Sequence, residues 1–194
     1  MVNHQVSRNF TFLFMTLVYA EPAWSGSEAA QNTSYGTSAL ASLTTGTNNT
    51  AIGVSSLYST NTGVGNTGLG EKSLYANTSG SSNTAIGAWT LQSNTTGDMN
   101  TAVGISALNA NTTGYRNTAV GKGALDANTT GYRNVAVGNN ALMLNTTGDS
   151  NTALGSNALQ DNTTGIDNTA LGRASLESNT TGSYNTSVGR SAMY

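Results

Sequence analysis

A strict period of seventeen residues constrains the fold of this chain more than any other feature. Ten units follow one another without insertion from Gly26 to Tyr194, the last one residue short. The two clearest copies, NTTGYRNTAVGKGALDA and NTTGYRNVAVGNNALML, occupy residues 111–127 and 128–144. The unit reads N-T-T-G-x-x-N-T-A-[VIL]-G-x-x-A-L-x-x, and we number its places 1 to 17 from the first Asn. A fixed period of this kind is the signature of a repeat protein, whose fold follows from a single unit.

Four places of the unit are almost invariant. Place 7 is Asn and place 11 is Gly in all ten units. Place 10 is Val, Ile or Leu except at Tyr35, and place 15 is Leu except at Met193. Comparison among the units therefore separates the places that the fold uses from those that vary freely.

Seventeen residues fit one coil of a parallel β-solenoid. Paired-helix repeats need about 33 residues or more, whereas stacked coils of β-structure lie about 4.8 Å apart. We therefore expect an all-β parallel β-solenoid, or β-roll, of ten coils over residues 26–194. The strand is expected at N-T-A-V-G, residues 117–121 and their equivalents, and N-T-T-G is expected at a corner. The Ala-Leu segment is left as either a second short strand or a short helical turn.

The Asn at place 7 predicts a structural ladder through the rod. Identical amides stacked in successive coils can hydrogen-bond one another, as in the Asn ladders of stacked β-structures. This interpretation needs no ligand. The ladder residues are predicted to include Asn83, Asn100, Asn117, Asn134, Asn151 and Asn168.

The expected core is thin, which predicts self-association. Each coil is expected to bury one Leu at place 15 and one aliphatic residue at place 10, each contributing about 1.5–3 kcal/mol. Ordering the backbone costs about 1–2 kcal/mol per residue, which two such side chains cannot offset. Ala at places 9 and 14, such as Ala119 and Ala124, is expected to permit close approach. We therefore predict a homo-oligomer and favour a trimer.

The N-terminal segment differs from the repeats. Residues 10–20, FTFLFMTLVYA, form an uncharged apolar run after a polar start that carries Arg8. This pattern predicts a secretory signal peptide cleaved after Ala20, with residues 1–25 as signal and linker. An apolar cap on the first coil is the alternative. Eleven residues are too few to span a bilayer, which takes about 20, so no membrane span is expected.

The residue types predict no enzyme, metal site or cofactor. His4 is the only histidine, lies in the N-terminal segment, and there is no Cys. The carboxylates fall at variable places, whereas catalysis needs a fixed geometry. GVGNTG, residues 63–68, formally matches a phosphate-binding G-x-G-x-x-G, but it is the corner and strand of a repeat. A formal net charge of −2 with scattered basic residues gives no basis for nucleic-acid binding.

Three outward features remain as candidates for contact with partners or for modification. N-T-T matches the N-glycosylation sequon at Asn111 and its equivalents. The alternative is that these residues only form the corner of the coil. Stacked Thr, such as Thr112 and Thr113, offer an ice-binding surface, although adjacent residues of a strand point to opposite sides. The only aromatic–basic pair repeated in adjacent units is the predicted partner contact, and it consists of Tyr115, Arg116, Tyr132 and Arg133.

The unit resembles two families of extracellular repeat protein. The run Asn117 to Gly121 and the pair Ala124–Leu125 resemble the head repeats of trimeric autotransporter adhesins. They resemble still more the N-T-T-G-x-x-N-T-A-L-G-x-x-A-L arrays of secreted bacterial and phage tail-fibre-type proteins. The resemblance covers residues 26–194, but the adhesin unit is shorter and no coiled-coil stalk, anchor barrel or chaperone domain is visible.

The resemblance implies a function outside the cell. We expect a non-enzymatic structural or adhesion module, a rod-like head or fibre segment that is secreted or exposed on a cell or virion surface. Its implied partners are further copies of the chain and a host-surface protein or glycan receptor. The alternative is an ice-binding solenoid that uses stacked Thr.

Overall fold

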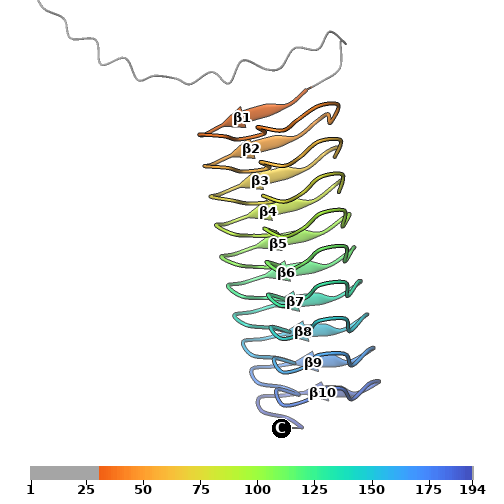
Figure 1. Ribbon diagram of the computed structural model, residues 1–194. Coiled ribbons are helices and arrows are strands. Elements are labelled where there is room, and N and C mark those ends of the chain that lie inside the picture. Colours follow the sequence, from red (N-terminus) through yellow and green to blue (C-terminus); the bar gives the residue numbers. More distant parts are fainter. Residues whose placement is uncertain (1–30, 194) are drawn as a thin grey trace, which may run out of the picture.

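The ten repeats form a single rod of stacked coils. The structure is a computed structural model that describes residues 31–193, and it confirms the parallel β-solenoid (Figure 1). Each coil contributes one short strand to a continuous sheet along one side of the rod. The predicted signal peptide and linker, residues 1–25, lie outside the described residues.

All ten strands belong to one parallel sheet and follow the order of the sequence. Each covers places 8 to 10 of its unit and pairs with the next at an offset of one unit, so that Thr101 faces Thr118. The strands are β1 (Thr33–Tyr35), β2 (Thr50–Ile52), β3 (Thr67–Leu69), β4 (Thr84–Ile86), β5 (Thr101–Val103), β6 (Thr118–Val120), β7 (Val135–Val137), β8 (Thr152–Leu154), β9 (Thr169–Leu171) and β10 (Thr186–Val188).

Only the middle residue of each strand points its side chain into the core. In β6, Ala119 is fully buried, while Val120 keeps 36% of its surface exposed. Successive side chains of a strand point to opposite faces, so Thr at place 8 and the aliphatic residue at place 10 share the outer face. The expectation that place 10 is buried is therefore wrong. Each coil has one aliphatic anchor in the core, the Leu at place 15, packed against Ala.

The Ala-Leu segment is neither a helix nor a second strand, and the described residues contain no helix. Leu125 is fully buried with φ +53°, as is the Leu at place 15 of most other coils, and place 13 is also left-handed, as at Ser106. A left-handed backbone at places 13 and 15 interrupts a right-handed helical turn, so the helical alternative is wrong. The backbone bonds to neighbouring coils instead: Leu108 donates to the carbonyl of Ala124 at 3.0 Å.

The Asn residues at place 7 bond from coil to coil. The backbone N–H of Asn134 donates to Oδ1 of Asn117 at 3.0 Å, and its Nδ2 donates to the carbonyl of Gly148 at 2.8 Å. Asn151 repeats both bonds one coil further, to Asn134 and Gly165. The side chains are buried, so these bonds supply partners for amides that no water reaches. The amide oxygen thus serves the next backbone N–H as much as the next side chain.

A second ladder runs through place 1, which the N-T-T-G pattern predicts at a corner. Nδ2 of Asn128 donates to Oδ1 of Asn111 at 2.9 Å and to the carbonyl of Gly131 at 3.0 Å. The same pair of bonds recurs at Asn145, one coil further. Two columns of buried amides therefore line the core beside the column of Leu.

Glycine at place 11 is required by both conformation and space. Gly104 has φ +131°, outside the range that other residues readily adopt. A Cβ at that position would lie 2.6 Å from the carbonyl oxygen of Gly121 in the next coil. Coils can stack closely at this corner only because no side chain is present.

The first-place ladder stops at Thr60, and this defect predicts a stabilising substitution. Oγ1 of Thr60 is the one buried polar side-chain atom of the described residues without a hydrogen-bond partner. In Thr60→Asn, the new amide can accept from Asn77 and donate to the carbonyl of Gly63. We expect the free energy of unfolding to rise by about 1–3 kcal/mol, since each bond contributes about 0.5–1.5 kcal/mol. Urea unfolding followed by circular dichroism measures the change.

The reverse substitution is the matched control. Asn111→Thr removes the Oδ1 that Asn128 uses and creates the defect seen at Thr60. It should lower the unfolding free energy by a similar amount. If both variants shift stability in the same direction, the ladder account of place 1 is wrong.

Candidate functional surfaces

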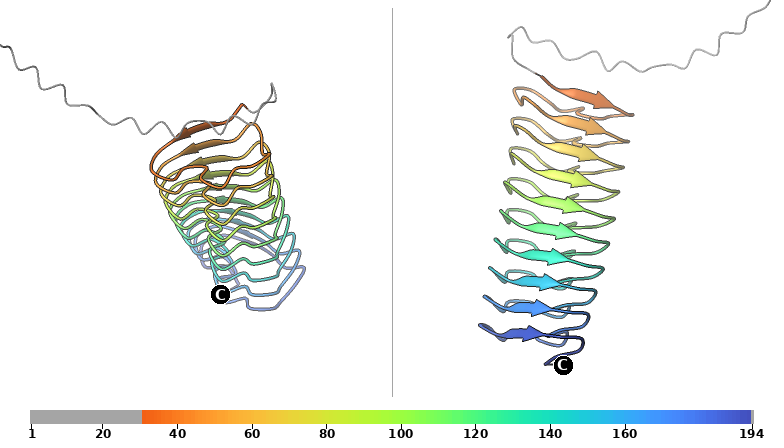
Figure 2. Two further views of the ribbon diagram at one scale, coloured as in Figure 1. Left: turned by 45° about the horizontal axis from the view of Figure 1, so that its top comes forward. Right: turned by 180° about the vertical axis from the view of Figure 1, so that it is seen from behind.

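The outer face of the sheet carries two uninterrupted columns of side chains. Figure 2 shows the strands stacked along this face. The column at place 8 is Thr in every coil except at Val135, and no residue in either column is charged. The column at place 10 consists of Tyr35, Ile52, Leu69, Ile86, Val103, Val120, Val137, Leu154, Leu171 and Val188. We call these two columns together the sheet face.

The aliphatic column of the sheet face is open to solvent. Ile86, Val120 and Val137 each keep 36–37% of their surface exposed, and Leu171 keeps 44%. Isolated apolar side chains are ordinary on a protein surface, whereas a contiguous apolar patch marks a site of contact with another molecule. The sheet face is therefore the main candidate for a docking surface.

The Thr residues at place 2 and those at place 8 differ in the surroundings of their hydroxyl groups. At place 2, the hydroxyl of Thr112 donates to the carbonyl of Thr129 at 3.0 Å, and Thr129 donates likewise to Thr146. These hydroxyls are thus committed to the backbone of the next coil. At place 8, Thr118 lies on the outer face of the sheet beside Val120. The outward pair is Thr and an aliphatic residue two places apart, not the adjacent Thr pair of the corner.

The small residues predicted to bring chains together lie inside the coil. Ala102 and Ala119 at place 9, and Ala107 and Ala124 at place 14, are fully buried in their own chain. They pack against the Leu column and cannot touch a neighbouring chain. The role assigned to these Ala residues was therefore wrong, and the exposed aliphatic residues at place 10 are the ones available for such a contact.

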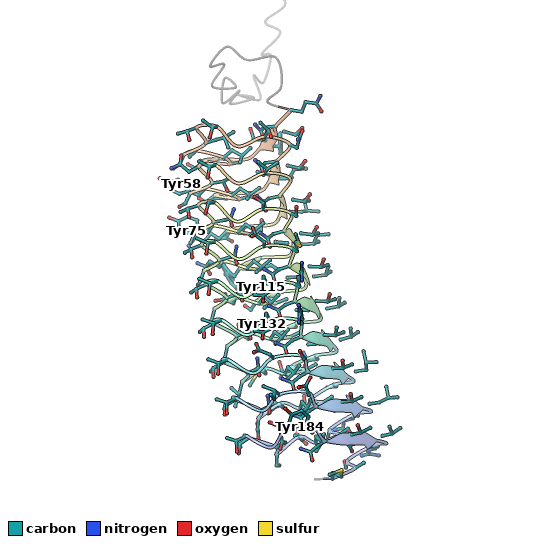
Figure 3. The ribbon with its side chains drawn as sticks, turned by 90° about the vertical axis from the view of Figure 1, so that its right-hand side faces the viewer. Tyr58, Tyr75, Tyr115, Tyr132 and Tyr184 are labelled. Carbon is teal, nitrogen blue, oxygen red and sulfur yellow. The ribbon has the colours of Figure 1, made fainter. Side chains whose placement is uncertain are left out.

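The tyrosines and arginines of the repeated Tyr-Arg pair lie together on the surface. The rings of Tyr115 and Tyr132 stack with centroids 4.8 Å apart and an interplanar angle of 3° (Figure 3). The guanidinium of Arg116 lies 5.9 Å from the ring centroid of Tyr115, and that of Arg133 lies 5.6 Å from that of Tyr132. Both distances are in the range of cation–π interactions. We call these four residues the tyrosine–arginine patch.

Asp149 lies at the edge of the tyrosine–arginine patch. Its Oδ1 accepts a hydrogen bond from the backbone N–H of Tyr132 at 2.8 Å. Its negative charge is the main cause that raises the pKa of the Tyr132 phenol, with smaller effects of desolvation and of Tyr115. The carboxylate therefore acts electrostatically on the patch, opposing the positive charge of Arg133.

A second stacked pair of tyrosines lies outside the predicted partner contact. The rings of Tyr58 and Tyr75, at place 16 of adjacent coils, lie 5.1 Å apart with an interplanar angle of 13°. The sequence feature that indicates this pair is the recurrence of Tyr at place 16 in neighbouring units. Figure 3 places this pair away from Tyr115 and Tyr132, and no arginine follows either residue.

Residues 31–193 contain no group of three His, Cys, Asp or Glu that could hold a metal ion. The carboxyl of Asp126 has a pKa raised by burial, but place 16 of the two adjacent coils holds the uncharged Asn109 and Met143. GVGNTG leads from a corner into β3, with no helix behind it. In the same part of the chain, no helix is long and apolar enough to cross a membrane.

Comparison with known proteins gives no assignment: no protein-family model, no curated protein and no solved structure matches the chain.

The sequons at place 1 are buried, which predicts how the protein tolerates N-glycosylation. Nδ2 of Asn111, the atom a glycan would modify, donates to Asn94 and to the carbonyl of Gly114 inside the core. In a eukaryotic host that secretes the chain, we expect folded, protease-resistant protein to lack glycans at Asn111 and Asn128. Mass spectrometry of the glycopeptides from that fraction measures this.

Asn48 provides the internal control. It begins the sequon Asn48-Asn49-Thr50 and is exposed at place 6. A glycan there is compatible with the folded coil. Glycans on Asn111 in the folded fraction would contradict the ladder at place 1.

Proposed function

We propose that the protein is a non-enzymatic extracellular rod, an adhesion head or fibre segment that presents its surface for attachment. The proposal is supported by how the repeated residues are used. The repeated Asn, Gly and Leu residues pack and hydrogen-bond inside the rod, where they hold one coil to the next. The variable places and the sheet face remain outside for contact with other molecules. Secretion, or exposure on a cell or virion surface, is part of the proposal.

The exposed aliphatic column is the observation that carries the proposal, because it gives the rod a surface that other molecules can cover. Further copies of the same chain fit this surface, since every copy presents an uncharged column with the same coil spacing. Each coil of one rod can therefore meet a coil of the next in the same way along their length. Three rods arranged about a three-fold axis can turn all three sheet faces inward, which closes the assembly. We favour this trimer, with a host-surface protein or glycan contacting the outer sides.

The oligomeric state tests the proposal. Light scattering coupled to size exclusion should find an elongated trimer for the secreted chain. In the triple variant Val103→Lys, Val120→Lys, Val137→Lys, three charges enter the centre of the sheet face, so the assembly should dissociate into monomers. Circular dichroism should remain that of the parent, since these side chains point outward.

The matched control places lysines in the same coils but elsewhere on the surface. Thr96, Thr113 and Thr130 are exposed at place 3, and their lysine variants should remain trimeric. A parent protein that is a compact monomer, or a control that dissociates as readily, would count against assembly through the sheet face.

Ice binding is the second candidate, and one observation favours it. The sheet face pairs outward Thr with outward aliphatic residues in straight columns that carry no charge. A regular surface of methyl and hydroxyl groups can order water in a matching lattice. This function needs the sheet face free, so it predicts a monomer that shows thermal hysteresis, and the lysine triple variant should abolish that hysteresis. A trimer without hysteresis would remove this candidate.

A further inference from the structure

The tyrosine–arginine patch holds two like charges in adjacent coils, and its nearest carboxylate, Asp149, is hydrogen-bonded to the backbone of Tyr132. Arg116 and Arg133 occupy place 6 of adjacent coils, whose backbones are about 4.8 Å apart. Each guanidinium lies over the ring of the preceding tyrosine. Like charges on adjacent coils repel each other even in water, so an anion placed between them is attracted by both.

The patch is also ordered before any ligand arrives. The two rings stack nearly parallel, and each ring positions the guanidinium that follows it. Arg116 and Arg133 have the same left-handed backbone, φ +56°, so both side chains leave the rod in the same way. A site whose side chains are already held loses less conformational entropy on binding. Guanidinium groups arranged in this way suit the oxygen atoms of a carboxylate or a sulfate.

The surroundings favour a sugar polymer over an acidic peptide. The patch is flanked in its own coils by the exposed hydroxyls of Thr113 and Thr130, and the phenol groups add two more hydroxyls. Thr recurs at place 3 along the rod, so a long polyhydroxylated chain lying along the axis meets further hydroxyls beyond the patch. Arginine clusters can also recognise acidic peptides, but a short acidic motif would leave the recurring hydroxyls beyond the patch without a contact.

We propose that Tyr115, Arg116, Tyr132 and Arg133 bind an acidic polysaccharide, with one carboxylate or sulfate group held between the two guanidinium groups. The inference rests on the proposed function, since it names the chemistry of the surface that the rod attaches to. Asp149 opposes the binding through its charge, and its oxygen also accepts the hydrogen bond from Tyr132. Charge and hydrogen bond can be separated there, because Asn keeps the acceptor and removes the charge.

The test measures binding of the full chain to immobilised polysaccharides by surface plasmon resonance. Dextran sulfate and polygalacturonate should bind, and the stronger of the two identifies sulfate or carboxylate as the anion. Neutral dextran should not bind. The double variant Arg116→Gln, Arg133→Gln should lose about tenfold or more in affinity, as expected when charged hydrogen bonds are removed. Asp149→Asn should bind more tightly than the parent.

The chain contains its own control for charge. Arg173 and Arg190 also lie one coil apart and are exposed, but at place 12 and without tyrosines beside them. The double variant Arg173→Gln, Arg190→Gln changes the net charge equally and should stay within about twofold of the parent, because surface charges away from a site act weakly. Circular dichroism of each variant confirms that the solenoid is intact.

Three results would overturn the proposal. The first is that neither polyanion binds the parent protein. The second is that the two arginine double variants lose affinity equally. The third is that poly-glutamate binds as tightly as the polysaccharides. The first would leave the patch without a ligand, the second would show general electrostatic attraction, and the third would assign an acidic peptide. Because several copies in one assembly raise the apparent affinity, light scattering of the parent and of each variant is measured alongside, and it separates a failure of this inference from a failure of the rod proposal.

Discussion

Every feature of this rod depends on the stacking of each coil on a near-copy of itself, one unit away. A buried amide is costly unless its donors and acceptor find partners. Here Asn117 finds them because the coils above and below supply the complementary atoms at the same place. The second ladder, through Asn111 and Asn128, works in the same way. The core can therefore contain two polar columns beside its single column of Leu.

Stacking also decides which residues are tolerated at each place. A residue must fit its own copy in the neighbouring coils, which is why a Cβ at Gly104 meets the carbonyl of Gly121. A charge would likewise face its copy about 4.8 Å away, at a cost of roughly 1 kcal/mol per pair even in water. This accounts for a chain with only 8% charged residues. Two pairs of arginines nevertheless share a place in adjacent coils, and only Arg116 and Arg133 have tyrosine rings beside their guanidinium groups.

The same geometry separates the interior of the rod from its outward chemistry. Because only the middle residue of each strand turns inward, the sheet presents Thr and aliphatic side chains in parallel columns along the rod. The proposed assembly with further copies uses places 8 and 10 of the unit, whereas the proposed recognition of a polysaccharide uses places 5 and 6. The sheet face suits a long, uncharged contact, whereas the tyrosine–arginine patch, confined to two coils, suits a localised anionic group.

The periodicity by itself determined the architecture. A strict seventeen-residue unit, with Gly at place 11 and a β-favouring N-T-A-[VIL] run, left the parallel solenoid as the fold, and it located every strand to within a residue or two. It also brought Tyr115 and Tyr132 to the same place of adjacent coils. These results need only the repeat length, since equal spacing in the chain becomes equal position in the stack.

The tertiary structure decided which side chains face in. Val120 was expected in the core and lies outside, because burial depends on which way a three-residue strand turns, and a single Thr-Ala-Val run does not reveal that. Leu125 was placed in a strand or helical turn, yet its left-handed backbone is stabilised only by burial and by bonds to neighbouring coils. The second ladder at Asn111 was missed for the same reason. Sequence specified which residues share a column, whereas packing between coils decided whether that column is core or surface.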